Sequence, residues 1–171
     1  PVPGPNPPPT ANAGPDQTVT DTNGHGTFVA GEIAATLNNA QGIAGVGLPA
    51  QLLIAKIVRS DGTISPDSEA NAIRWAVDNG ARVINMSFGG GQDTPLLHNA
   101  IKAAAQAGAL LMAAAGNSGS TVPLYPAAYD EVLAVSAVGP DMRLASYSSF
   151  GPKVGIAAPG GDIDTGGWSF A

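Results

Sequence analysis

The chain has no cysteine among its 171 residues, which excludes a disulfide framework and a thiolate metal site. Charged residues make up only 12% of the sequence and aromatic residues 5%. The formal net charge is −6 at pH 7, and no cluster of lysine and arginine is present, which argues against nucleic acid or an anionic membrane as a partner. No apolar run is long enough to span a bilayer. The absence of a signal peptide at the start is compatible with a cytosolic protein, a processed secreted protein or a fragment.

Apolar residues account for 44% of the sequence, enough to bury a sizeable core in one domain. The first 20 residues differ from the rest, because six of the first ten are proline. Proline favours an extended, unpaired backbone, so we interpret residues 1–20 as a proline-rich linker or tail. The second half of this segment also resembles the first strand of the polycystin-type immunoglobulin-like repeats, over too short a stretch to predict a whole module.

From residue 21 onward, apolar periodicity predicts helices and short apolar runs predict buried strands. The helices are expected at 27–37, from Ser65-Pro66 to Gly80, and from Thr94-Pro95 to Gly108. The strands are expected at 51–58, 81–90, 109–116, 131–139 and 154–161. Alternating strands and helices indicate an α/β fold with a parallel sheet and helices on its faces.

Ligands of such sheets bind beyond the carboxyl ends of the strands, which singles out the loops at 87–91 and 114–120. The first loop, SFGGG, predicts either an edge that pairs with an extended peptide or a flexible strand end. In the second, Asn117 predicts either a donor to a developing oxyanion or a turn residue that bonds its own backbone. His25 lies between two glycines just before a helix, which suits either a presented imidazole or a surface turn. We expect His98 to be solvated, without a paired carboxylate, and Trp75 to belong to the core.

Six segments stand in the order and approximate spacing found in subtilisin-like serine proteases, and the chain resembles this family over residues 21–163. The combination is far more specific than any one motif. The resemblance implies a three-layer, mostly parallel sheet flanked by helices, truncated, with residues 21–171 forming a partial peptidase domain. The segments are DTNGHGTFVAGEIAA, LNNAQGIAGVG, ARVINMSFGG, AAAGNSG, YPAAYDEVLAVSAV and IAAPGGDI.

The resemblance also implies roles for individual residues. His25 matches the catalytic histidine, although Phe28 stands where the family usually has a second histidine. Asn117 matches the oxyanion-hole asparagine, whose side-chain amide faces the tetrahedral oxygen. The residues that match the strand end that pairs with the substrate backbone are Ser87, Phe88 and Gly89. Those that match the wall of the primary specificity pocket are Ala114, Ala115 and Gly116.

The segment LNNAQGIAG is similar to the calcium loop of the family. It implies coordination by the Asn39 side chain and by the carbonyls of Leu37, Gln41 and Ile43, and oxygen ligands suit this hard cation. The family completes the site with an aspartate and a residue from an earlier segment, which this chain does not show. No cofactor is expected for the chemistry itself.

The catalytic triad is incomplete in the sequence. The family's aspartate closes a strand well before the histidine, whereas Asp16 and Asp21 lie too close to His25, and Asp164 repeats the motif's letters at the wrong end of the chain. Ser169 in GWSFA resembles the nucleophile motif, after a shorter gap than the family has. The chain stops two residues later, where the family has a helix. A match and a coincidence both stay open for Ser169.

We therefore expect a subtilisin-type serine endopeptidase that acts on peptide or protein substrates and is weak or inactive as this chain. Segments of the family outside this chain, or a neighbouring domain, are candidate partners. The alternatives are a catalytically dead peptide-binding module and a truncated fragment without a function. The resemblance implies a secreted, extracellular protein.

Overall fold

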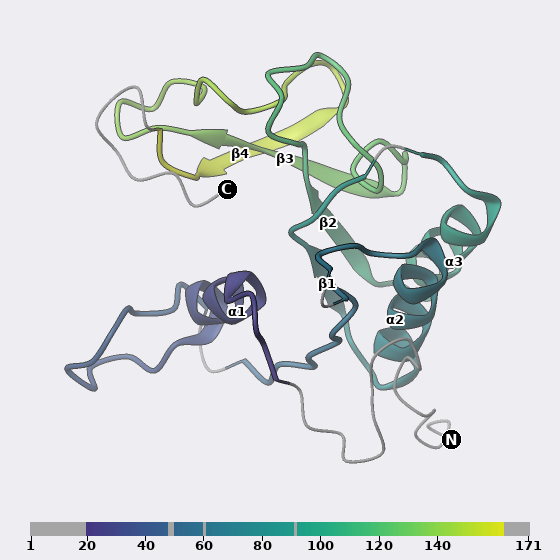
Figure 1. The fold of residues 1–171 in the computed structure, drawn as a ribbon, viewed down its shortest axis with the longest axis horizontal. Helices are drawn as coiled ribbons and strands as arrows, with labels where there is room; N and C mark the ends of the chain where they lie inside the picture. Colours follow the sequence, from purple (N-terminus) through teal and green to yellow (C-terminus); the bar gives the residue numbers. More distant parts are fainter. Residues whose placement is uncertain (1–19, 48–49, 60, 91, 163–171) are drawn as a thin grey trace. The chain divides into compact units, whose positions relative to one another are not determined.

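The computed structural model describes residues 20–47, 50–59, 61–90 and 92–162, and the chain divides into two compact units, residues 1–79 and 80–171. Among these described residues, no helix combines the length and apolarity that a membrane crossing requires. The first unit contains the helices α1 (His25–Ala34) and α2 (Pro66–Asp78) (Figure 1). The second contains β1 (Val83–Met86), α3 (Pro95–Gln106), β2 (Leu110–Ala114), β3 (Val132–Val138) and β4 (Val154–Pro159).

The second unit is built on a parallel sheet with the strand order β1-β2-β3-β4. Neighbouring strands in the sheet are also neighbours in the sequence, and α3 forms the crossover from β1 to β2 and contacts β2. The predicted parallel α/β architecture is confirmed. Because all four strands point the same way, the segments that follow β1 and β2 emerge at one edge of the sheet.

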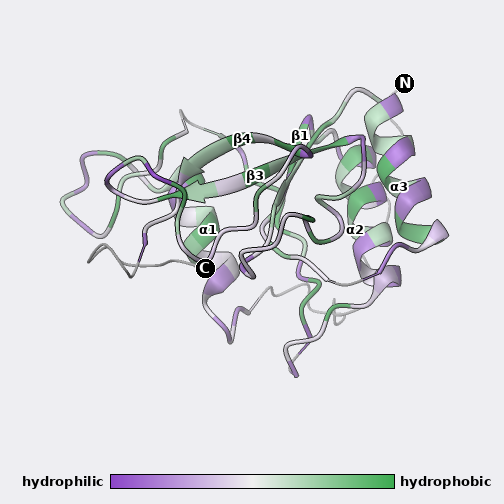
Figure 2. Ribbon diagram, turned by 90° about the horizontal axis from the view of Figure 1, so that it is seen from above, coloured by the Kyte–Doolittle hydropathy of each residue, from purple (hydrophilic) through white to green (hydrophobic). Residues whose placement is uncertain are grey.

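A side-chain hydrogen bond at the start and a left-handed glycine at the end define the bounds of α3. Thr94 is the N-cap, and its hydroxyl accepts a hydrogen bond from the Leu97 N–H at 3.3 Å. Gly108 takes a φ of +85° just after the helix, a conformation that favours glycine. Hydrophobic and hydrophilic residues alternate along α3 (Figure 2), and its buried residues form one stripe. The buried residues are Leu97, Ala100, Ile101 and Ala104.

The connections from β2 to β3 and from β3 to β4 contain no helix among the described residues 115–131 and 139–153. Side-chain bonds hold the second connection close to the end of β4. Asp162, only 4% exposed, accepts hydrogen bonds from the Ser146 N–H at 3.1 Å and the Ser146 hydroxyl at 3.0 Å. The Tyr147 hydroxyl donates to the Gly160 carbonyl at 2.9 Å. Specific polar contacts rather than regular structure therefore hold the second connection in place.

In the first unit, α2 has the predicted start and stop. The Ser65 hydroxyl accepts from the Ser68 N–H at 3.2 Å, and Gly80 follows the helix with a φ of +86°. Ile73 is 3% exposed, whereas Trp75 is only half-buried, so the prediction of a core tryptophan is met only in part. Burial raises the pKa of Glu69, in the first turn of the helix, to about 7.

Helix α1 begins two residues before the predicted start and ends at Ala34, before Leu37. The loop that follows folds back onto the helix, because the Gly45 N–H donates to the Ala35 carbonyl at 3.1 Å and the Gly47 N–H to the Ile33 carbonyl at 2.8 Å. These bonds satisfy carbonyls that a further helical turn would otherwise use. No residue of α1 is buried within the described structure.

The predicted strand at 51–58 is wrong, because residues 51–59 have no regular secondary structure. The side chains of Leu52, Leu53 and Ile54 are 37%, 41% and 49% exposed, and only Ile57 in this stretch is buried. A strand needs a hydrogen-bonded neighbour, and no other described strand pairs with this segment. Its apolar composition predicts burial but does not supply the partner.

Candidate peptide-binding and catalytic site

The pairing of β1 with β2 brings two predicted site segments to the same edge of the sheet. Met86, the last residue of β1, is in register with Ala113 in β2. The stretch Ser87–Gly89 therefore leaves the sheet beside Ala114–Asn117, as the sequence predicts. Ser87 and Phe88 are half-buried, and Gly89 is exposed. We call these two stretches the peptide-binding edge, after the role that the sequence predicts for them.

A third segment, which the sequence analysis missed, joins the two stretches. The Gly90 N–H donates to the Tyr125 carbonyl at 2.8 Å, and the Tyr125 N–H donates back to the Gly90 carbonyl at 3.1 Å. The Leu124 N–H donates to the Ala115 carbonyl at 3.1 Å. The backbone at 124–125 is thus hydrogen-bonded to the ends of both stretches.

The Leu124 side chain lies between the two stretches and contacts a glycine on each. A Cβ atom on Gly89 would lie 3.1 Å from the Leu124 Cβ, and one on Gly116 would lie 3.1 Å from the Leu124 Cγ. Gly116 also has a φ of +115°, which side chains rarely tolerate. Leu124 is therefore a candidate determinant of side-chain preference. Nothing in its sequence context points to this role, since the contact depends on the fold of the connection.

Asn117 follows directly on Gly116 and is exposed. Its carboxamide makes no hydrogen bond with any of the described residues, so it does not cap its own turn as the alternative interpretation expects. A free amide donor at the edge of a sheet can stabilise negative charge that develops on a bound carbonyl oxygen.

His25 is the first residue of α1, and a carboxylate organises the loop that presents it. Asp21 accepts four hydrogen bonds, from the N–H groups of Asn23, Gly24 and Thr27 at 2.8–2.9 Å and from the Thr27 hydroxyl at 2.8 Å. These donors, the Gly24 N–H first, hold the pKa of Asp21 well below its usual value. The N-cap residue Gly24 has no side chain that could accept a hydrogen bond, and the Asp21 carboxylate accepts the N–H groups at the helix start instead. The sequence analysis missed this role.

The structure describes residues 37–43, the loop in which calcium binding is predicted. The Asn39 side-chain oxygen accepts the Gln41 N–H at 3.0 Å, so one predicted ligand already closes a turn. The Leu37 and Ile43 side chains are 49% and 48% exposed. Across the described residues, no group of three or more His, Cys, Asp or Glu side chains could hold a metal ion. The predicted ligands are all neutral oxygens, and carboxylate charge is what commonly tightens a calcium site of six to eight oxygen ligands. The calcium site stays a prediction.

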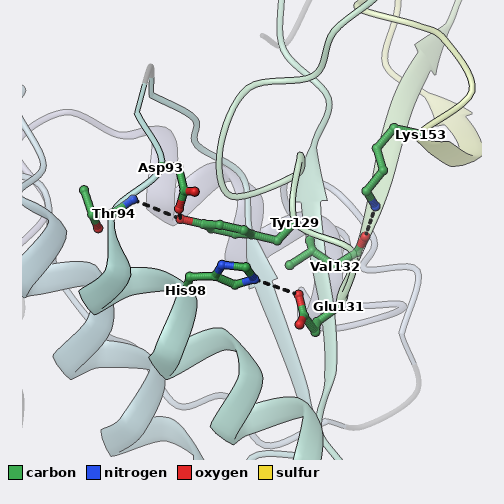
Figure 3. Close-up of polar contacts among 7 residues, drawn as sticks. All are labelled: Asp93, Thr94, His98, Tyr129, Glu131, Val132 and Lys153. Carbon is green, nitrogen blue, oxygen red and sulfur yellow. Dashed lines mark hydrogen bonds and ion pairs between the residues drawn. The ribbon is translucent and has the colours of Figure 1, made fainter.

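The expectation that His98 is solvated without a carboxylate partner is wrong. Its Nε2 lies 3.3 Å from the Glu131 Oε2, and its ring stacks on Tyr129 with centroids 4.2 Å apart (Figure 3). The helix turns this residue toward the segment that leads into β3. The helical pattern alone could not show that partner.

The candidate nucleophile Ser169 lies outside the described residues, as do Asp16 and Asp164. His25 belongs to the first unit and Asn117 to the second. Their roles, and those of the other predicted site residues, stay predictions.

Comparison with known proteins gives a consistent result. A profile described as the Subtilase family matches residues 7–170. A "Thermostable alkaline protease" of Halalkalibacterium halodurans is 44% identical over 145 residues, which are 85% of this chain and 40% of that protein. The "Minor extracellular protease Epr" of Bacillus subtilis is 42% identical over 144 residues, 84% of this chain and 22% of that protein.

Among solved structures, a psychrophilic subtilisin-like protease from an Antarctic Pseudoalteromonas superimposes with a TM-score of 0.71 at 41% identity. The match covers 80% of this chain and 32% of that protein. The chain thus spans about half or less of the length of the proteins that it matches.

Proposed function

The chain belongs to the subtilase family, and from this premise we propose that it supplies the peptide-binding edge and the oxyanion donor of a subtilisin-type serine endopeptidase. The observation that carries the proposal is the convergence of Ser87–Gly89 and Ala114–Asn117 at one edge of a parallel sheet. An edge of this kind can take up an extended peptide as an added strand, while small residues leave room for a substrate side chain.

The chemistry that we propose is acyl transfer. A peptide pairs with Ser87–Gly89, and a serine hydroxyl attacks the scissile carbonyl carbon while the His25 imidazole takes its proton. The carbonyl oxygen becomes an oxyanion, which the Asn117 amide stabilises. His25 then returns the proton to the leaving amine, and a water molecule hydrolyses the acyl-enzyme by the same steps.

The nucleophile is either Ser169 or a serine outside this chain. The sequence shows no match to the aspartate strand of the family, and removal of that aspartate from a triad lowers turnover by about four orders of magnitude. We therefore propose very weak turnover, or none, for these 171 residues alone. Segments of the family outside the chain are proposed to complete the site.

A fluorophosphonate probe tests the enzymatic part of the proposal. We expect slow labelling of Ser169 in the wild-type chain, loss of labelling in Ser169→Ala, and unchanged labelling in the control Ser118→Ala, which alters an exposed serine. Labelling that survives Ser169→Ala would assign the nucleophile elsewhere. Peptide binding without labelling would favour the inactive binding module. A broad, non-cooperative melt without peptide binding would favour the fragment without a function.

We extend the proposal to the ion and the location. With neutral oxygens only, the loop at 37–43 is expected to bind calcium no more tightly than the millimolar range of weak sites. A large drop in Tm on adding a chelator would contradict this. Extracellular localisation is proposed because one relative is named an extracellular protease. Fractionation of cells that express the complete gene would test it.

A further inference from the structure

A cluster of polar and aromatic side chains ties the start of α3 to the segment that leads into β3, at Asp93, Thr94, His98, Tyr129 and Glu131 (Figure 3). We propose that Tyr129 in this cluster is a positioning residue for the peptide-binding edge. It attaches the chain that follows Ser87–Gly89 to the connection at 124–131. This inference rests on the proposed function, which it deepens by naming a residue that holds the binding strand in place.

The hydroxyl of Tyr129 binds the residues at which the connection from β1 to α3 ends. The residue is 3% exposed, and its hydroxyl donates to the Asp93 Oδ1 at 2.9 Å. The same oxygen accepts the Thr94 N–H at 3.3 Å. Asp93 and Thr94 are the last residues before α3, and Thr94 caps that helix. One buried hydroxyl thus fixes the point at which the chain passes from the peptide-binding edge into α3.

The ring of Tyr129 contacts Tyr125, which is hydrogen-bonded to the beginning of the same connection. The Tyr125 ring packs against it with centroids 4.6 Å apart and an angle of 53° between the planes. Tyr125 in turn exchanges two backbone hydrogen bonds with Gly90, the residue next to Gly89. Both Gly90 and Asp93 are therefore linked to Tyr129, one through an aromatic neighbour and the other through the hydroxyl.

The ring of Tyr129 also stacks on His98 of α3, which is linked to the start of β3. His98 stacks on Tyr129 at 4.2 Å, and its Nε2 is 3.3 Å from the Glu131 carboxylate, with side chains 29% and 23% exposed. Glu131 directly precedes β3, and the Lys153 ammonium donates to the Val132 carbonyl at 3.0 Å. The cluster is thus attached to α3 and to β3, and transmits their rigidity to the edge.

The hydroxyl is chemically suited to this role. Burial, together with donation to Asp93, raises the pKa of Tyr129 to about 12. The group therefore stays protonated, and remains a donor, throughout the neutral range.

The test compares Tyr129→Phe with Tyr147→Phe in the full chain. Tyr129→Phe removes the 2.9 Å bond to Asp93 and the 3.3 Å bond from the Thr94 N–H, whereas Tyr147→Phe removes one 2.9 Å bond, to Gly160, which does not belong to the peptide-binding edge. The readouts are the Kd for a fluorescein-labelled, uncleavable extended peptide and amide exchange at residues 87–90. We expect Tyr129→Phe to weaken binding about tenfold, as loss of a hydrogen bond to a charged group does, and to speed exchange at 87–90. Tyr147→Phe should lower Tm without either effect.

A second pair of variants separates the hydrogen bond from the charge and protects the test against misfolding. Asp93 is exposed, so its substitution leaves the core intact. Asp93→Ala should reproduce the Tyr129→Phe effects, whereas Asp93→Asn should retain wild-type binding because its amide oxygen still accepts the hydroxyl. Equal losses in both Asp93 variants would overturn the inference, because charge at the helix start would then be the cause.

Equal peptide affinities and equal exchange in Tyr129→Phe and Tyr147→Phe would also overturn it. If the wild-type chain binds no peptide, the proposed function fails, and the exchange measurement decides the inference alone. Faster exchange at 87–90 only in Tyr129→Phe would then support the positioning role, and unchanged exchange would reject it.

Discussion

Replacement of Leu124 by alanine should enlarge the space between the two stretches of the peptide-binding edge. The leucine touches Gly89 on one side and Gly116 on the other, where an added Cβ would come within 3.1 Å of it. The substitution removes three carbons from a half-buried side chain. At about 0.8 kcal/mol for each fully buried methylene, and about half of that here, the expected loss of unfolding free energy is roughly 1 kcal/mol.

The effect on specificity should exceed the effect on stability. Fit of one additional methylene in an apolar pocket is worth about 1–3 kcal/mol, so peptides with a large apolar residue at the bound position should gain at least about tenfold over alanine peptides. Fluorescence anisotropy with matched phenylalanine and alanine peptides measures this ratio in Leu124→Ala. The control is Leu144→Ala, which removes the same atoms from a leucine that is 43% exposed and lies outside the edge. An affinity ratio that is the same in both variants and in the wild type would refute the assignment of Leu124.

Three further predictions concern stability and its pH dependence. Glu69→Gln should stabilise the chain by roughly 1–2 kcal/mol above pH 7 and by nothing below pH 4.5, because the raised pKa of about 7 makes ionisation costly only in the folded state; the partly exposed side chain limits the gain. Urea unfolding at pH 4 and pH 8 measures this, and equal shifts at both values would contradict it. Asp21→Ala should lower Tm at pH 7, and the difference should shrink as the pH falls below 3.8, since the lowered pKa makes the contribution of Asp21 present above that value. A Tm difference that grows on acidification would refute the capping role. Gly116→Ala should cost about 1–3 kcal/mol through its positive φ, and a chemical denaturation curve identical to wild type would contradict the observed backbone.

The sequence predicts best those elements whose signals are local. Helix α3 carries its own start in Thr94-Pro95, its own stop in Gly108 and a stripe of apolar residues between them, and the structure follows all three. The predicted strands from 81 onward also appear, because each finds a parallel neighbour within the same unit.

The errors arise where structure depends on partners distant in the sequence. The stretch at 51–58 has the composition of a buried strand, but no described strand pairs with it, and its leucines stay exposed. His98 looked solvated because its partner Glu131 is 33 residues away and reaches it only through the fold. Leu124 and Tyr129 were missed for the same reason. The candidate site was predictable at the strand ends, and its supporting contacts were not.

The central claim is the proposal that an extended peptide pairs with Ser87–Gly89 so that the Asn117 amide meets its reacting carbonyl. A crystal structure of the chain with a bound, uncleavable peptide tests this directly. The account predicts main-chain hydrogen bonds from the peptide to Ser87–Gly89, with the Asn117 amide within hydrogen-bond reach of one peptide carbonyl oxygen. A peptide bound away from this edge, or bound there with the Asn117 amide out of reach of every peptide carbonyl, would contradict it.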